Sequence, residues 1–126
     1  MNNGKVDWTD PFSFTGPAAV DVDWEPDGLV SVRTIQVNLN EAASTAEAVT
    51  AKILNSDGKT VFNFGSFTPS YESPETEFSV VCENEEAPIV PIGGKVTVDF
   101  TNTDDIDPID VIIGYRKVHA DNLGYR

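Results

Sequence analysis

The sequence has little cysteine, histidine or positive charge. Its 126 residues include one cysteine, Cys82, and one histidine, His119. An intrachain disulfide is therefore excluded, and a zinc site with chelating Cys and His ligands is not expected. Only eight Lys and Arg residues stand against 21 Asp and Glu residues, which gives a net charge of −13. Binding to nucleic-acid phosphates or to anionic lipid needs clustered cations, so neither nucleic acid nor a membrane is an expected partner.

Long hydrophobic runs and long helices are also missing. No run approaches the roughly 18 apolar residues of a membrane span, and the segment 1–5 lacks the apolar region of a secretory signal peptide. We therefore expect a protein that is made in a cytoplasm and stays soluble. Eight prolines are spread along the chain and disfavour long helices. The alanine-rich window 40–48 has no large apolar residue to anchor a helical face, so a loop is expected there.

The segment 29–39 has the alternating, β-branched pattern of a strand. Its later half places Ile35, Val37 and Leu39 on one face, which we expect to point into a core. The parity of the apolar positions changes after Val32. This change predicts either a β-bulge near Arg33 or burial of both faces at that point.

A β-hairpin is predicted over residues 48–67. Val49, Ala51 and Ile53 alternate in the first strand, and the return strand covers 60–67. The connection at 55–58 ends in Asp-Gly, and glycine adopts the positive φ of tight hairpin turns at little cost.

Four further segments have the pattern of strands. They cover residues 78–83, 88–92, 95–101 and 109–118, and the prolines that bracket 88–92 favour an edge position. The near-continuous apolar run at 111–113 indicates burial on both faces. The sequence therefore predicts an all-β fold, an antiparallel β-sandwich or jelly roll of about seven to eight strands. Its core domain covers residues 29–118, and a C-terminal tail covers 119–126.

Residues 1–28 are expected to form an extended N-terminal arm or to add a strand. They contain both tryptophans and two phenylalanines, namely Trp8, Phe12, Phe14 and Trp24. These rings could cap the domain's own core, with an extra strand at 18–24. Alternatively, the segment could pack on a neighbouring subunit, because burial of aromatic rings offsets the entropy lost on ordering an arm.

No motif indicates catalysis or a cofactor. The sequence contains neither a nucleophile elbow nor a phosphate-binding loop, so we expect a protein that is not an enzyme and that carries no cofactor. Cys82 follows an apolar run and is expected to fill space in the core. Asp104, Asp105 and Asp107 supply the oxygen ligands that calcium prefers, but they lack the spacing of an EF-hand. A solvated acidic turn is the favoured interpretation, with a metal site as the weaker one.

The negative charge is unevenly distributed. Residues 69–110 contain eleven acidic residues and one lysine, a net charge of −10, whereas residues 111–126 have a net charge of +2. A charged run is usually a solvated face, although it can also orient contacts with a partner.

Two stretches resemble small accessory proteins of tailed-bacteriophage particles. One begins at the strand 32–37 and continues through the Ser/Thr-containing stretch 43–53; the other is Pro91–Asp104, with a Gly-Gly turn, a strand and Thr-Asn-Thr-Asp. The resemblance covers about residues 30–115, and the aromatic first 28 residues lie outside it. The family often has Asp after its glycine, where this chain has Gly94-Lys95. The resemblance implies an all-β capsid decoration (cement) protein or a head or tail appendage, with no catalytic residues.

These observations predict a non-enzymatic phage structural protein that decorates and stabilises the head shell within the virion. Its expected partners are the major capsid protein and further copies of itself, as a dimer or trimer. The predicted contact residues are Trp8, Phe12, Phe14, Trp24, Tyr115, Arg116, Tyr125 and Arg126. Two alternatives stay open: a tail or fibre component, and a carbohydrate-binding β-sandwich module. The second would stack sugars on Trp8, Trp24, Phe67 or Tyr71 and could use the acidic turn to bind calcium.

Overall fold

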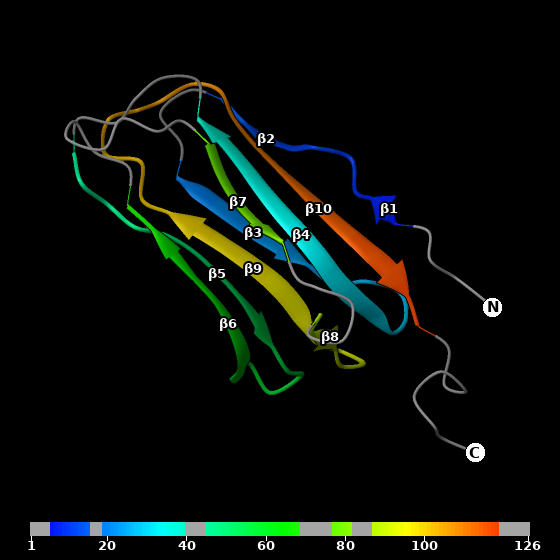
Figure 1. Ribbon diagram of the computed structural model, residues 1–126. Helices are drawn as coiled ribbons and strands as arrows, with labels where there is room; N and C mark the ends of the chain where they lie inside the picture. Colours follow the sequence, from blue (N-terminus) through cyan, green and yellow to red (C-terminus); the bar gives the residue numbers. More distant parts are fainter. Residues whose placement is uncertain (1–5, 16–18, 40–44, 69–76, 82–86, 119–126) are drawn as a thin grey trace, which may run out of the picture.

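The computed structural model is an antiparallel β-sandwich of two facing sheets (Figure 1). It describes residues 6–15, 19–39, 45–68, 77–81 and 87–118. This part of the chain contains ten strands and no helix, so the predicted all-β fold is confirmed. No helix in it is long and apolar enough to cross a membrane. Cys82, Tyr71 and the tail 119–126 lie outside the described residues.

The first sheet is built on two long central strands, β4 (Val30–Leu39) and β10 (Ile109–Lys117). Each central strand has a pair of short strands along its free edge, so the sheet is four strands wide. The short strands are β1 (Asp7–Trp8) and β2 (Phe12–Phe14) along β10, and β7 (Glu77–Val81) and β8 (Ile89–Val90) along β4.

The second sheet has the order β3-β9-β5-β6. Its strands are β3 (Val20–Trp24), β9 (Lys95–Phe100), β5 (Val49–Leu54) and β6 (Thr60–Phe67). The extra strand expected at 18–24 is thus observed as β3, which pairs with β9. Within 6–15 the N-terminal segment runs extended along β10 of its own chain, because β1 and β2 pair there.

A β-bulge lies at Arg33, which is one of the two alternatives that the change of apolar parity predicts. Gly114 of β10 is opposite Thr34, and the next residue, Tyr115, is opposite Val32, so Arg33 has no partner across the ladder. The extra residue shifts the alternation by one position. Val32 and Ile35 can therefore both be fully buried in the same core although their numbers differ in parity.

The core between the sheets is almost entirely aliphatic. Of its 18 buried hydrophobic residues, Phe100 is the single aromatic one in the described part of the chain. Five further rings pack against this core and are half-buried: Phe12, Phe14, Trp24, Phe64 and Tyr115. β-branched side chains suit a pleated inner face, whereas the rings close the open sides of the sandwich.

The predicted hairpin is formed by β5 and β6. The amides of Asp57 and Lys59 donate to Oδ1 of Asn55, and Gly58 takes a φ of 83° at the end of the turn. The return strand differs from the expected regular alternation. The register of β5 against β6 shifts twice, and these shifts leave Val61 and Phe64 without opposite residues on β5. Most of β6 is consequently exposed.

Candidate interaction surfaces

The exposed tryptophan of the N-terminal segment lies on a glycine. Trp8 of β1 is opposite Gly114 of β10, and a Cβ atom placed on Gly114 would come within 2.9 Å of the indole ring. The absence of a side chain at Gly114 therefore creates the space for the ring on the outer face of the first sheet. Trp8 is still 51% exposed, so it is available to a partner.

The other predicted aromatic contacts are directed to the chain's own core. Phe12, Phe14 and Trp24 are half-buried against it, which favours the interpretation that these rings cap the domain. The structure brings two of the predicted residues together, because the ring centroids of Trp24 and Tyr115 lie 4.9 Å apart. Both rings line an open hollow of about 500 Å³ beside the turn at 25–29. Arg116 is half-buried on β10, and Tyr125 and Arg126 lie outside the described residues.

The acidic turn after β9 is fastened to the segment that precedes β5. Oδ2 and Oδ1 of Asp104 accept hydrogen bonds from the amide and the hydroxyl of Thr45, at 2.8 and 2.7 Å. In the same way, Glu47 accepts from the amide of Thr103 at 2.9 Å and from its hydroxyl. The side chains of Asp104 and Glu47 therefore connect two loops that are more than fifty residues apart in sequence; we call these contacts the loop staples.

The proposed calcium ligands do not converge. Asp104 uses both carboxylate oxygens on Thr45, while Asp105 and Asp107 are exposed. Within the described ranges, no group of three or more His, Cys, Asp or Glu side chains is placed to hold a metal ion.

We therefore expect millimolar calcium to leave the melting temperature of the protein unchanged, because six to eight oxygens do not meet at this turn. Thermal unfolding followed by circular dichroism, with calcium and then with excess chelator, measures this directly. A rise in melting temperature with calcium that Asp104→Asn abolishes would establish a metal site at the turn.

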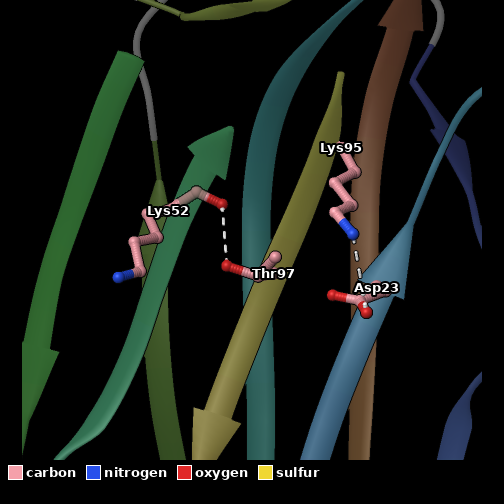
Figure 2. Close-up of polar contacts among 4 residues, drawn as sticks. All are labelled: Asp23, Lys52, Lys95 and Thr97. Atoms are coloured by element: carbon pink, nitrogen blue, oxygen red, sulfur yellow. Dashed lines mark hydrogen bonds and ion pairs between the residues drawn. The ribbon is translucent and has the colours of Figure 1, made fainter. Parts of the chain in front are cut away.

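The outer face of the second sheet is polar and carries charges of both signs. Asp99 of β9 is directly opposite Asp21 of β3, with Asp23 further along the same strand. Figure 2 shows the ion pair between Lys95 Nζ and Asp23, at 3.7 Å, on this face. It also shows the Thr97 hydroxyl donating to the carbonyl of Lys52 at 3.5 Å.

Partial burial raises the pKa of Asp99 above its ordinary value of 3.8, and repulsion by Asp21 and Asp23 raises it further. The positive charge of Lys52 opposes this shift. A carboxyl whose pKa is raised by folding binds its proton more tightly in the native state. Its ionisation therefore lowers stability as the pH rises from about 3.8 through the folded-state pKa.

Replacement of Asp99 by asparagine is accordingly expected to raise the melting temperature at pH 7, because the partly buried charge and its repulsion of Asp21 are removed. The gain should disappear below the unfolded-state pKa of 3.8, where the native carboxyl is already protonated. Melting curves of both proteins across this range test the sign, and a loss of stability at pH 7 would contradict it. Asp57→Asn, at an exposed hairpin position, is the matched control.

An apolar hollow at one open side of the sandwich was not predicted from the sequence. It measures about 560 Å³ and lies between β6 and β8. Its lining is uncharged: Leu29, Val61, Phe62, Pro88, Ile89, Pro91 and Ile92. We call these seven residues the edge patch. One feature of the sequence could have indicated this surface: residues 60–67, which form β6, contain no charged residue although the chain is strongly acidic.

The edge patch concentrates the exposed apolar side chains of the described structure. The described structure has five exposed large hydrophobic residues. Four of them belong to the edge patch: Val61 (50%), Phe62 (36%), Ile89 (36%) and Ile92 (68%). The fifth is Trp8. Contiguous exposed apolar groups of this kind mark interaction sites more often than scattered single residues do.

Known proteins give no guide to these surfaces: neither any protein-family model nor any curated protein matched the sequence.

Proposed function

We propose that this chain is a non-enzymatic structural protein of a bacteriophage particle, a capsid decoration protein that binds the major capsid protein and stabilises the head shell. The resemblance of residues 30–115 to small virion proteins of tailed phages is the starting point. The observation that carries the proposal is that the surface is divided into a small apolar part and a large acidic part. Exposed apolar groups gather at the edge patch and Trp8, while none of the acidic side chains whose exposure the structure describes is buried.

Two features of the domain support binding to a shell in many copies. An acidic surface keeps a protein soluble at high concentration and repels the packaged genome. The aliphatic core and the loop staples at Asp104 and Glu47 give a rigid body, which loses little conformational entropy when it docks. Asp104, one of the calcium ligands considered from the sequence, thus contributes to the shape of the domain through its hydrogen bonds to Thr45.

Trp8 is the residue of the predicted contact set that we assign to the shell. It is the most exposed of the four N-terminal rings, and its position over Gly114 holds it on the outer face of the first sheet. Tryptophan is the side chain most enriched at the energetic centres of protein interfaces.

Co-sedimentation with empty shells of the encoding phage tests the proposal. We expect the chain to bind the shells at a fixed stoichiometry and to raise their melting temperature. Trp8→Ala should weaken binding at least tenfold, whereas Phe14→Leu, which alters a half-buried ring on the same segment, should leave affinity within a factor of about three. Failure of the wild-type chain to bind shells would contradict the proposal.

A further inference from the structure

The edge patch includes residues from both sheets. Val61 and Phe62 come from β6, the last strand of the second sheet, and Ile89 comes from β8, beside β4 in the first sheet. Figure 1 shows the β5–β6 turn and β8 at the same end of the sandwich. An occupant of the hollow would therefore contact both layers at once and close this side of the core.

The outer edge of β6 offers backbone hydrogen-bonding groups next to the hollow. In the described structure β6 pairs with β5 on one side and with no strand on the other. Natural edge strands are commonly protected by lysine, proline or an inward-pointing charge. β6 contains none of these, and within the described ranges its two bulges are the one feature that protects the edge. The Phe62 and Phe64 rings pack edge to face, with centroids 4.9 Å apart, beside this open edge.

Charge decides which partner the edge patch fits. A basic partner would be drawn to the acidic faces of a chain with a net charge of −13, and the uncharged patch offers it no electrostatic attraction. Two copies of the chain repel one another over most of their surfaces. They can approach closely where neither carries charge, and the seven patch residues together with strand 60–67 form such a region.

We propose that the edge patch is the surface through which two copies of this chain form a dimer. A twofold axis close to β6 places the same residues of both copies against each other, which is the arrangement of a closed homodimer. Ile92, Val61 and Phe62 are then covered by their counterparts. The exposed stretches of β6 outside the bulges can add main-chain hydrogen bonds to the contact. The dimer uses the edge patch and leaves Trp8 exposed for the shell. Dimer formation and shell binding can therefore be measured separately.

Sedimentation equilibrium of the wild-type chain tests the dimer first. At about 100 µM, far above a micromolar dissociation constant, the mass is expected to be twice 13.7 kDa. Ile92→Asp and Val61→Asp place a carboxylate of each copy in the contact, and each should weaken the dimer at least tenfold. Both positions are exposed, so both variants should keep the wild-type circular dichroism spectrum. The control Thr15→Asp adds the same charge at an exposed position outside the patch and should leave the dimer intact.

Hydrogen exchange at β6 gives a second readout that needs no variant. Amides in 60–67 should exchange more slowly at high than at low chain concentration, while those of β3 should not respond. A wild-type chain that is monomeric at about 100 µM, or an oligomer that both patch variants leave unchanged, would overturn the proposal. Monomeric wild-type chain whose shell binding is lost in Ile92→Asp would assign the patch to the capsid protein instead, and would overturn it equally.

Discussion

Replacement of Asn102 by alanine is expected to lower the free energy of unfolding by about 3–7 kcal/mol. The Asn102 side chain is buried and spans the turn after β9, where Nδ2 donates to the carbonyl of Ile106 at 3.0 Å and Oδ1 accepts from the Ile106 amide at 2.9 Å. Alanine leaves both buried backbone groups without these partners, at about 1–3 kcal/mol each. It must also adopt a φ of 60°, which costs about 1 kcal/mol more.

Two variants separate these contributions. Asn102→Gly loses the same hydrogen bonds but accepts the positive φ, so it should be about 1 kcal/mol more stable than Asn102→Ala. Asp105→Ala imposes alanine on a similar backbone, with φ 56°, at an exposed residue and should cost about 1 kcal/mol. Chemical denaturation of the three variants gives the comparison. A cost for Asn102→Ala no larger than that for Asp105→Ala would contradict the assigned role of the side chain.

Replacement of Gly114 by valine is expected to cost about 3 kcal/mol and to release Trp8 from the first sheet. A Cβ atom at this position would lie 2.7 Å from Cγ2 of Thr34 and 2.9 Å from Cζ3 of Trp8, closer than packed carbon atoms approach. The Thr34 side chain is buried and stiff at χ1, so the ring must move instead. Thermal unfolding and a red shift of tryptophan emission measure the two effects.

Gly28 provides the matched control for this substitution. A Cβ atom there meets no other atom within 4 Å, so Gly28→Val should change stability by less than about 0.5 kcal/mol. A second test combines Gly114→Ala with Thr34→Ser, which removes the clashing Cγ2 methyl group and should recover part of the loss. Equal stabilities for the two valine variants would disprove the packing role of Gly114.

Strands β4 and β5 could be predicted because buried and less buried residues alternate along most of their length. Val49, Ala51 and Ile53 lie on the inner face as expected, and even the bulge at Arg33 left a trace as a change of parity. A period of two residues becomes visible when a strand is long enough to repeat it. Strand β1 has two residues, too few to show a period, and its pairing depends on β10. Strand β8 is equally short and was expected only from the prolines that bracket residues 88–92.

The turn after β9 shows what a local pattern cannot give. Its composition predicts a polar turn, yet Ile106 is buried in the core, and Asn102 is buried with its side chain hydrogen-bonded to the Ile106 backbone. In the sequence, Asp104 and Glu47 cannot be distinguished from solvent-exposed acids. Their hydrogen bonds to Thr45 and Thr103 form only because two loops that are distant in sequence lie close together in the fold. Such roles arise from tertiary contact, which alternation and composition do not encode.

The edge patch was missed for a related reason. Val61 and Phe62 have the composition of a buried strand, and regular alternation would direct one of the two inward. The double register shift against β5 and the position of β6 at the end of its sheet leave both exposed. Of the predicted contact residues, Trp8 is exposed on the outer face as a contact requires, whereas Phe12, Phe14 and Trp24 are directed to the chain's own core.

The central claim, that this chain decorates the shell of a phage particle, is tested most directly by quantitative mass spectrometry of purified particles. The account predicts the chain in every particle at a fixed, simple ratio to the major capsid protein, in the many copies that a lattice of equivalent shell sites requires. Its absence from purified particles would contradict the claim. So would a count of only a few copies per particle, which is the number expected of a tail or fibre component.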